Sequence, residues 1–292
     1  MGEDITMSEK DIQMTKIKGQ QFDEERALYG VRDTIIKKCV FAGEADGESA
    51  LKEAKNIKVN SCSFNLRYPL WHVKKFTLKN SDMSGNCRAP IWYSSNGKIK
   101  ECMMKGIKTL RECKNISIDR SSVDSAEFGW KCKDIVITNS DITSEYLFFD
   151  SKNITLQKID MKGKYSFQYI KNLYIENSTL DTKDAFWHSK NVVVKDSVIK
   201  GEYLGWFSEG LTLVNCKIIG TQPLCYCKNL VLVDCTMENC DLAFEYSEVE
   251  ASIIGNVDSI KNPREGIITV DSVGKVIMED AVMDCKGSVV IR

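Results

Sequence analysis

Apolar residues recur along most of the chain with a spacing of 19 residues. Lines of 19 residues align with one another when they begin at Asn96, Asn115, Asp134, Asn153, Asn172, Asn191, Gly210 and Asn229. If the first residue of each line is position 0, position 3 is always aliphatic, position 8 is always apolar and position 2 is mixed. This alternation is typical of a strand that buries one face.

Turn-forming residues divide each line into three segments. Position 0 is nearly always Asn, Asp or Gly, position 5 is rich in Asn and Asp, and position 10 is often Gly, all residues that tolerate left-handed backbone. Three short strands and three corners make one coil of a solenoid. We therefore predict an all-β, right-handed parallel β-helix of about eleven coils, stacked by parallel strand pairing at ~4.8 Å.

The ends of the chain depart from the repeat. We expect residues 1–20 to form an N-terminal leader, residues 21–55 an irregular first coil and cap, and residues 56–292 the β-helix. Within the cap, residues 48–55 have the pattern of a short helix that covers the open end of the solenoid. Near the C-terminus, Asn262, Pro263 and Gly266 predict a loop before the last coil.

The composition and the hydropathy of the chain exclude several classes of function. The 292 residues carry 40 Lys and Arg against 41 Asp and Glu, and this near-neutral balance argues against a nucleic-acid binder. No apolar run approaches the ~20 residues that cross a bilayer, and the N-terminus lacks the apolar core of a secretory signal. We therefore expect a cytoplasmic protein that binds neither nucleic acid nor membrane.

The twelve cysteines follow the repeat. Seven occupy positions 6 and 17, where Ser is the usual alternative, so we interpret them as small core residues. We expect no metal and no cofactor. A minor alternative is a thiol-based role for Cys225, Cys227 and Cys240.

Several segments carry a family resemblance. KNLYIENSTLDTKDAFWHSKN, GEYLGWFSEGL, IIGTQPLCYCKNL and CDLAFEYSEVEA, with the entry segment FDEERALYG, resemble a bacterial family of uncharacterised single-domain proteins in the pectate-lyase-like β-helix superfamily. The resemblance covers most of the chain and implies the fold. It implies no particular activity, although members of the superfamily largely cleave or bind acidic polysaccharides.

Aromatic residues gather in the third segment of each line, positions 12 to 17. Tyr is common at position 12, Phe at position 14 and Trp at position 15, and both histidines, His72 and His188, fall at position 16. Strict alternation would place positions 12, 14 and 16 outside and the Trp residues in the core, whereas a bulge would turn the Trp residues outward. We favour alternation.

The middle coils hold the candidate site. Asp150, Tyr169 and His188 share position 16 on successive coils, so Asp150 and His188 should lie about 10 Å apart and act as acid and base on opposite sides of a bound group. Aromatic rings beside carboxylates suit sugars. The expected binding residues are Lys131, Tyr146, Phe148, Tyr165, Phe167, Asp184, Phe186, Trp187, Tyr203, Trp206, Phe207, Tyr226 and Glu245.

These features predict a protein that binds a carbohydrate, a sugar derivative or another small molecule. Its enzymatic form would be a sugar-modifying lyase or hydrolase acting through the aromatic and carboxylate-lined face. The alternative is a non-catalytic binding or scaffold module that uses the aromatic face for a protein partner or for assembly into a homo-oligomer.

Overall fold

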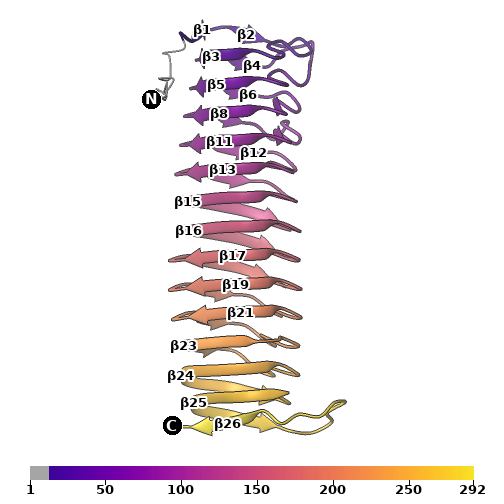
Figure 1. The fold of residues 1–292 in the computed structure, drawn as a ribbon, viewed down its shortest axis with the longest axis vertical. Coiled ribbons are helices and arrows are strands. Elements are labelled where there is room, and N and C mark those ends of the chain that lie inside the picture. Colours follow the sequence, from indigo (N-terminus) through magenta and orange to yellow (C-terminus); the bar gives the residue numbers. More distant parts are fainter. Residues whose placement is uncertain (1–12) are drawn as a thin grey trace, which may run out of the picture.

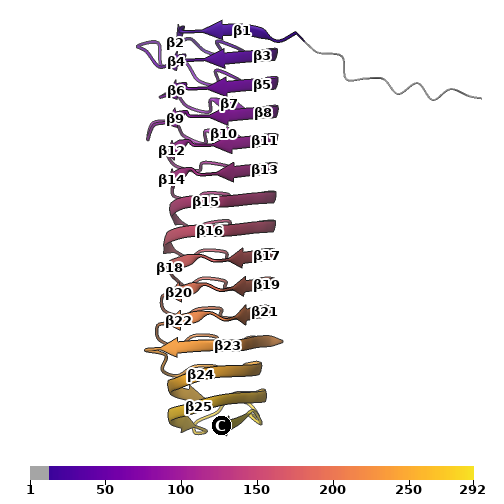
Figure 2. The same ribbon diagram turned by 90° about the vertical axis from the view of Figure 1, so that its left-hand side faces the viewer.

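The computed structural model describes residues 13–292 as one parallel β-solenoid (Figures 1 and 2). About 15 turns stack along one axis, which at ~4.8 Å per turn gives a rod on the order of 70 Å long. β1 and β26 lie at opposite ends of the rod (Figure 1). The predicted all-β solenoid is confirmed, and its right-handedness stays a prediction.

Each coil has three sides. The first side is formed by β1 (Thr15–Lys18), β3 (Arg32–Lys37), β5 (Lys55–Asn60), β8 (Lys74–Lys79), β11 (Ser95–Lys100), β13 (Lys114–Asp119), β17 (Lys171–Glu176), β19 (Lys190–Lys195), β21 (Glu209–Val214) and β26 (Ser288–Ile291). The second side is formed by β2 (Gln21–Phe22), β4 (Val40–Phe41), β6 (Ser63–Phe64), β9 (Asp82–Met83), β12 (Met103–Lys105), β14 (Ser122–Asp124), β18 (Thr179–Lys183), β20 (Val198–Lys200) and β22 (Lys217–Ile219). Five longer strands bend from the first side into the second: β15 (Lys133–Glu145), β16 (Lys152–Lys164), β23 (Leu230–Glu238), β24 (Glu248–Lys261) and β25 (Glu265–Ile277). β24 and β25 continue onto the third side, where Ile260 of β24 bridges Ala243.

The third side is mostly not a β-strand. Two short strands, β7 (Leu70–Trp71) and β10 (Ile91–Trp92), pair there. In the coils from Lys108 to Tyr246, every second residue of this side takes a left-handed conformation, as Tyr165, Phe167 and Tyr169 do with φ of 57°, 62° and 58°. The coils still exchange backbone hydrogen bonds, because the amide of Tyr169 donates to the carbonyl of Trp187 on the next coil at 2.9 Å.

This backbone overturns the expected alternation of the third side. Positions 13 and 14 both point inward, so Phe148, Phe167 and Phe186 are fully buried in the core and cannot contact a ligand. The rings of Phe167 and Phe186 stack there at 5.1 Å. Position 15 points outward, as the bulge alternative implied. The alternation rule fails because it holds for extended residues and not for a run of left-handed ones.

Small residues at positions 6 and 17 complete the core through hydrogen bonds. The amide of Cys102 donates to Ser121 Oγ at 3.1 Å, and Ser121 Oγ donates to the carbonyl of Asp119 at 3.0 Å. Cys fills the same space with a weaker donor, as when Cys216 Sγ donates to the carbonyl of Val194. Eleven of the twelve cysteines are buried, in agreement with their interpretation as core residues, and burial raises the pKa of Cys87 to about 11.

Asparagine side chains link neighbouring coils at position 0. Asn172 Nδ2 donates to Asn153 Oδ1 at 2.9 Å, and Asn153 Nδ2 donates to Asp134 Oδ1 at 2.7 Å. All three residues have φ between 56° and 57°. Asn and Asp suit this corner because they accept left-handed backbone and bond along the rod.

Three described segments near the ends differ from the sequence-based expectation. The predicted leader lies partly outside the described residues, but β1 already belongs to the solenoid. Residues 48–55 are not helical: Ser49 and Glu53 have φ of 64° and 61°, and the segment forms the third side of its coil. The segment from Asn262 to Arg264 is only a corner between β24 and β25. The estimate of about eleven coils was low because coils with other repeat lengths were not recognised.

Three coils carry extra residues at the corner between the second and third sides. Neighbouring coils are offset by 23 residues at Asp33 and Asn56, by 21 at Val73 and Ser94, and by 20 at Cys227 and Ser247. In each case the added residues lie between the second and third sides, and strand pairing resumes after them.

Replacing Phe167 with Ala should lower the free energy of unfolding by about 3–5 kcal/mol, because it empties a fully buried site. Tyr169→Ala, two residues further on and 47% exposed, is the control and should cost far less. Urea unfolding followed by circular dichroism measures both. Equal losses would contradict the inward orientation of position 14.

Candidate functional site

The outward residues at position 15 bind the neighbouring coil. The indole Nε1 of Trp187 donates to the carbonyl of Tyr203 at 2.7 Å, that of Trp206 to Gln222 at 2.8 Å, and that of Trp130 to Tyr146 at 2.9 Å. Gln168 Nε2 donates to the carbonyl of Asp184 in the same way at 3.2 Å. The side chains at position 15 therefore supply hydrogen-bond donors to the backbone carbonyls at position 12 of the next coil.

Aromatic residues at position 16 form a stack of Tyr169, His188, Phe207 and Tyr226, and the buried Tyr246 is tilted by 45° beyond Tyr226. These five residues are here called the aromatic ribbon. His188 lies between Tyr169 and Phe207, with ring centroids 5.0 and 5.1 Å away and interplanar angles of 13° and 8°. Phe207 and Tyr226 continue the stack at 4.8 Å. The rings cover one another's faces and present their edges to solvent.

The structure places Asp150, Tyr169 and His188 on three successive coils of one column. The amide of Asp150 donates to the carbonyl of Gln168, directly before Tyr169, and the ring of Tyr169 stacks on that of His188. All three side chains are exposed, as is Lys131 one coil before Asp150. Their catalytic role stays a prediction.

Glu245 does not occupy the column expected for it. The amide of Tyr226 donates to the carbonyl of Glu245, just as the amide of His188 donates to that of Trp206 at position 15. The extra residue in this coil thus moves Glu245 to position 15 and Tyr246 to position 16. Glu245 pairs with Lys261 at 2.8 Å. Burial raises the pKa of Tyr226, and the nearby Glu245 carboxylate adds to the shift.

Asp184 is a buried carboxylate at position 12, between Tyr165 and Tyr203 on the neighbouring coils. Only 8% of the residue is exposed. Burial raises its pKa, Lys183 opposes this shift, and Glu202 adds to it.

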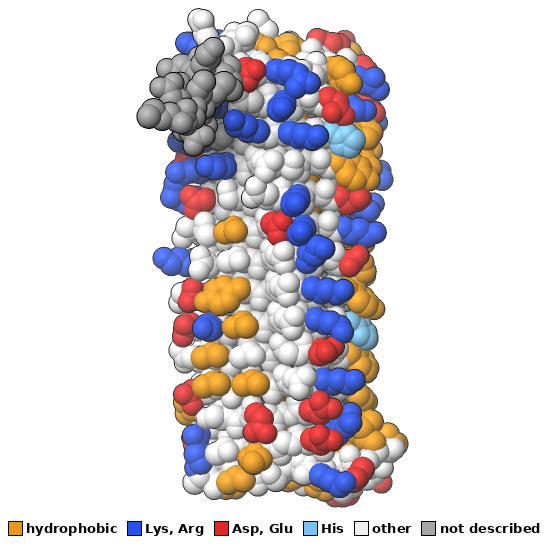
Figure 3. Space-filling view, viewed as in Figure 1, with side chains coloured by type: hydrophobic (Ala, Val, Ile, Leu, Met, Phe, Trp, Pro, Cys, Tyr) orange, Lys and Arg blue, Asp and Glu red, His pale blue; other side chains and the backbone are white. Residues whose placement is uncertain are grey.

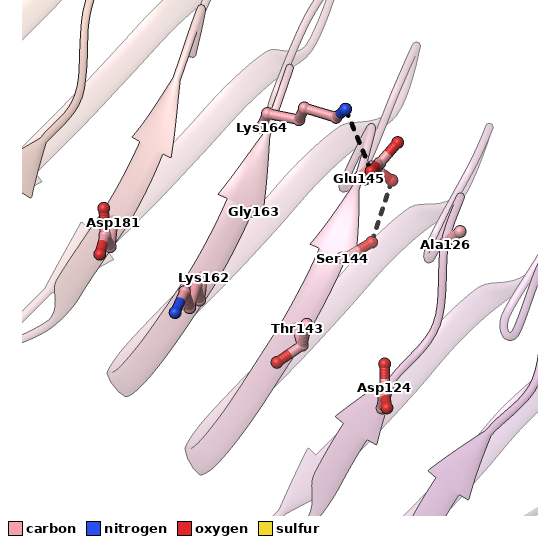
Figure 4. A pocket seen from close by; sticks show the side chains of 9 residues that line it. All are labelled: Asp124, Ala126, Thr143, Ser144, Glu145, Lys162, Gly163, Lys164 and Asp181. Atoms are coloured by element: carbon pink, nitrogen blue, oxygen red, sulfur yellow. Dashed lines mark hydrogen bonds and ion pairs between the residues drawn. The ribbon is translucent and has the colours of Figure 1, made fainter.

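A groove of about 530 Å³ opens at the corner between the second and third sides (Figure 4). It is lined by Asp124, Ala126, Thr143, Ser144, Glu145, Lys162, Gly163, Lys164 and Asp181, from β14, β15, β16 and β18. Glu145 and Lys164 form an ion pair at 3.2 Å across it. A Cβ at Gly163 would collide with the carbonyl oxygen of Ser144, so glycine permits the close approach of the coils there.

Two tyrosines border this groove. Tyr146 and Tyr165 follow Glu145 and Lys164 in the chain, and their rings stack at 4.9 Å. Lys164 Nζ lies 5.5 Å from the ring centroid of Tyr165. Of the predicted binding residues, Tyr146 and Tyr165 therefore lie beside the groove, whereas the aromatic ribbon lies at the other end of the third side. The sequence did not predict the groove-lining residues at positions 9 to 11, because the residue types at these positions vary from coil to coil. Only the glycines at position 10 indicated that neighbouring coils approach closely there.

A second aromatic cluster surrounds the insertion in the coil of β8 and β9. Trp71 and Trp92 stack at 5.5 Å, and Tyr68, His72 and Tyr93 surround them. His72 Nδ1 lies 2.8 Å from Glu53 Oε1. The indole nitrogens of Trp71 and Trp92 are buried without a hydrogen-bond partner among the described residues. Because of the two-residue insertion, Trp92 and Tyr93 do not align with the aromatic positions of the other 19-residue lines.

Among residues 13–292, no group of three or more His, Cys, Asp or Glu side chains is arranged to hold a metal ion. In the same part of the chain, no helix is long and apolar enough to cross a membrane.

The stacked coils and their exposed third side define the molecule as a parallel β-solenoid with a ligand-sized corner groove. The chain belongs to the family described as "Protein of unknown function (DUF3737)", whose model matches residues 15–291. This confirms the resemblance to an uncharacterised family. No protein of curated function matches the sequence.

Solved structures with similar architecture come from several bacteria. The A-module of the mannuronan C-5 epimerase AlgE4 from Azotobacter vinelandii is 10% identical, with a TM-score of 0.32 over 94% of this chain and 91% of that one. PfbA, a surface adhesin of Streptococcus pneumoniae, is 10% identical, with a TM-score of 0.30 over 76% and 71%. The family 28 exopolygalacturonase of Yersinia enterocolitica is 8% identical, with a TM-score of 0.29 over 94% and 70%. At these values the likeness supports no conclusion about function.

Trp187→Phe should destabilise the protein by about 1 kcal/mol more than Trp71→Phe, because only the former leaves a carbonyl without its donor. Both changes remove the same atoms. Thermal and urea unfolding measure the difference, and an equal cost would show that the indole hydrogen bond does not stabilise the third side.

Asp184→Asn should raise the stability at neutral pH. The raised pKa of Asp184 means that its charged form is disfavoured in the folded state, so stability is lost as the pH rises through that pKa. The gain should disappear below about pH 4, where the carboxyl is neutral in both states. Urea midpoints at both pH values test this, with the exposed Asp160→Asn as control.

Proposed function

We propose that the protein binds a neutral oligosaccharide or sugar derivative in the corner groove. The observation that carries the proposal is a groove lined by hydroxyl, carboxylate and ammonium groups and bordered by two tyrosines. Its volume of about 530 Å³ lies within the range typical of small-molecule sites.

The groove residues match the hydrogen bonding of sugar hydroxyls. Asp124 and Asp181 lie on the two outer strands, and Thr143 and Lys162 lie on the strands between them (Figure 4). Carboxylates accept hydrogen bonds from hydroxyls, an ammonium donates to them, and the Thr hydroxyl does both. With carboxylates prominent in the lining, a neutral ligand suits this groove better than an anionic one.

The aromatic ribbon is less suited to sugars than the sequence suggested. Stacking of a sugar needs a free ring face, and the ribbon's rings cover each other's faces at about 5 Å. Its exposed edges, with Tyr169 and Phe207 at 47% and 43%, favour a second candidate function, in which this apolar strip contacts a protein partner or a second copy of the chain.

A sugar-modifying activity would extend the proposal to Asp150, Tyr169 and His188. It is supported by their common column and their exposure. Such an activity requires turnover that is lost in His188→Ala while thermal stability is retained. Lost stability with unchanged ligand binding would instead identify a structural imidazole.

The proposal is tested by thermal shift with neutral oligosaccharides of different linkages. A ligand at 100 times its Kd should stabilise the native state by about 2.7 kcal/mol. The double variant Asp124→Asn/Asp181→Asn should bind at least about tenfold more weakly, since each change removes a charged acceptor. Asp141→Asn/Asp160→Asn, with the same charge change on exposed second-side positions, is the control and should bind normally. No shift with any neutral sugar, or equal weakening in both variants, would contradict the proposal.

A further inference from the structure

The outward face of the first side carries an almost uncharged area in the middle of the rod. From β15 to β23, the side chains at positions 2 and 4 point outward, because those at positions 1 and 3 are buried. We call the outward residues of these coils the first-side patch, and Figure 3 shows hydrophobic side chains along this face. The strand register aligns its position-2 residues on six successive coils: Val136, Thr155, Tyr174, Val193, Thr212 and Val231.

The residue types change at the borders of the first-side patch. Position 2 is Lys98 nearer the N-terminal end of the rod and Glu250 nearer its C-terminal end, whereas no charged residue stands at position 2 from Val136 to Val231. Parallel sheets are normally covered on both faces. Here Val136 and Val233 are 42% and 39% exposed. The patch therefore has the composition of a covered sheet face but is open in the part of the chain that the structure describes.

The two charged residues of the patch lie at its centre. Glu176 and Lys195 share position 4 on adjacent coils and are aligned by the strand register. Among residues 13–292, neither belongs to an ion pair. Gln157 Nε2 donates to Glu176 Oε2 at 3.1 Å, and Lys195 Nζ lies 6.0 Å from the ring centroid of Tyr174. Each charge can therefore pair with an opposite charge from outside the chain.

We propose that the first-side patch binds the same patch of a second copy of the chain, with the two rods antiparallel. A two-fold axis along the strand direction, between β17 and β19, places Glu176 of each copy opposite Lys195 of the other. The same axis places Tyr174 opposite Val193. Parallel rods would fit less well, because a two-fold axis along the rod places position 2 opposite position 4, so that Glu176 would face Tyr174 and gain no positive partner.

The match continues to the borders of the patch. The antiparallel arrangement places Thr155 opposite Thr212 and, on the outermost coils, Val136 opposite Val231. Six coils at ~4.8 Å and strands of six residues at ~3.3 Å cover about 600 Å² on each copy, or about 1,200 Å² in total, which reaches the size of stable interfaces. The lysines at the start of the first side lie at the rim, where long side chains reach solvent.

The experiment measures the mass of the whole protein by sedimentation equilibrium from about 1 to about 100 µM. The mass should rise from 33.0 kDa toward twice that value. Glu176→Lys places like charges opposite each other and should weaken the dimer at least about tenfold. Glu238→Lys makes the same charge change at an exposed second-side position and should alter the dimer constant by less than about twofold. A monomer at every concentration, or equal weakening by both variants, would overturn the proposal.

A charge exchange keeps the test independent of folding losses. Lys195→Glu should weaken the dimer as Glu176→Lys does, because it places two carboxylates opposite each other. A mixture of these two variants should form a heterodimer, and the double variant Glu176→Lys/Lys195→Glu should dimerise like the original chain, since both restore opposite charges across the axis. If neither the mixture nor the double variant recovers association, the antiparallel contact is wrong.

A further variant separates this contact from the aromatic ribbon, which lies on the third side. Tyr169→Ala removes an exposed ribbon residue and should leave the dimer constant unchanged within about twofold. Dissociation by Tyr169→Ala and not by Glu176→Lys would place the contact on the ribbon and overturn the proposal. The patch also lies away from the corner groove, so the proposal does not depend on the function proposed for that groove.

Discussion

Hydrogen bonding between successive coils is the constraint on which the rest of this structure depends. Each coil must return to a register in which its amides meet the carbonyls of the next, on the third side as well as on the two strand sides. The third side meets this demand with alternating left-handed residues, which direct the Phe residues inward and the Trp residues outward. The Trp indoles then bind the position-12 carbonyls, so the aromatic content of this side is first a consequence of backbone geometry.

The sequence predicted the solenoid because every coil has the same packing and hydrogen-bonding requirements, and these recur every 19 residues. An aliphatic residue at position 3, a small hydrogen-bonding residue at position 6 and Asn at position 0 each recur where the structure needs them. The inward and outward positions of the third side were predicted wrongly, because strict alternation holds only for an extended backbone. The residue types of Tyr165, Phe167 and Tyr169 do not indicate a left-handed conformation. These positions are occupied by bulky residues rather than by the usual Gly or Asn.

The candidate site was predicted only in part. The column of Asp150, Tyr169 and His188 followed directly from the 19-residue period, whereas Glu245 was displaced by one extra residue in its coil. The groove was missed because it depends on the shape of a corner and on the absence of a side chain at Gly163. The Lys at the end of most lines was visible in the sequence, and the strand register shows that Lys133, Lys152 and Lys171 stack one above another on consecutive coils.

The corner between the second and third sides, which absorbs extra residues in three coils, gives this rod an attachment point. Coils of 20, 21 and 23 residues all resume the same register after the second side, so the stacking tolerates added length there. A foreign peptide inserted after a second-side strand would project from the rod at a defined height. Inserts in several coils would lie at distances fixed by the coil spacing, so the solenoid could hold grafted epitopes or enzymes at defined separations.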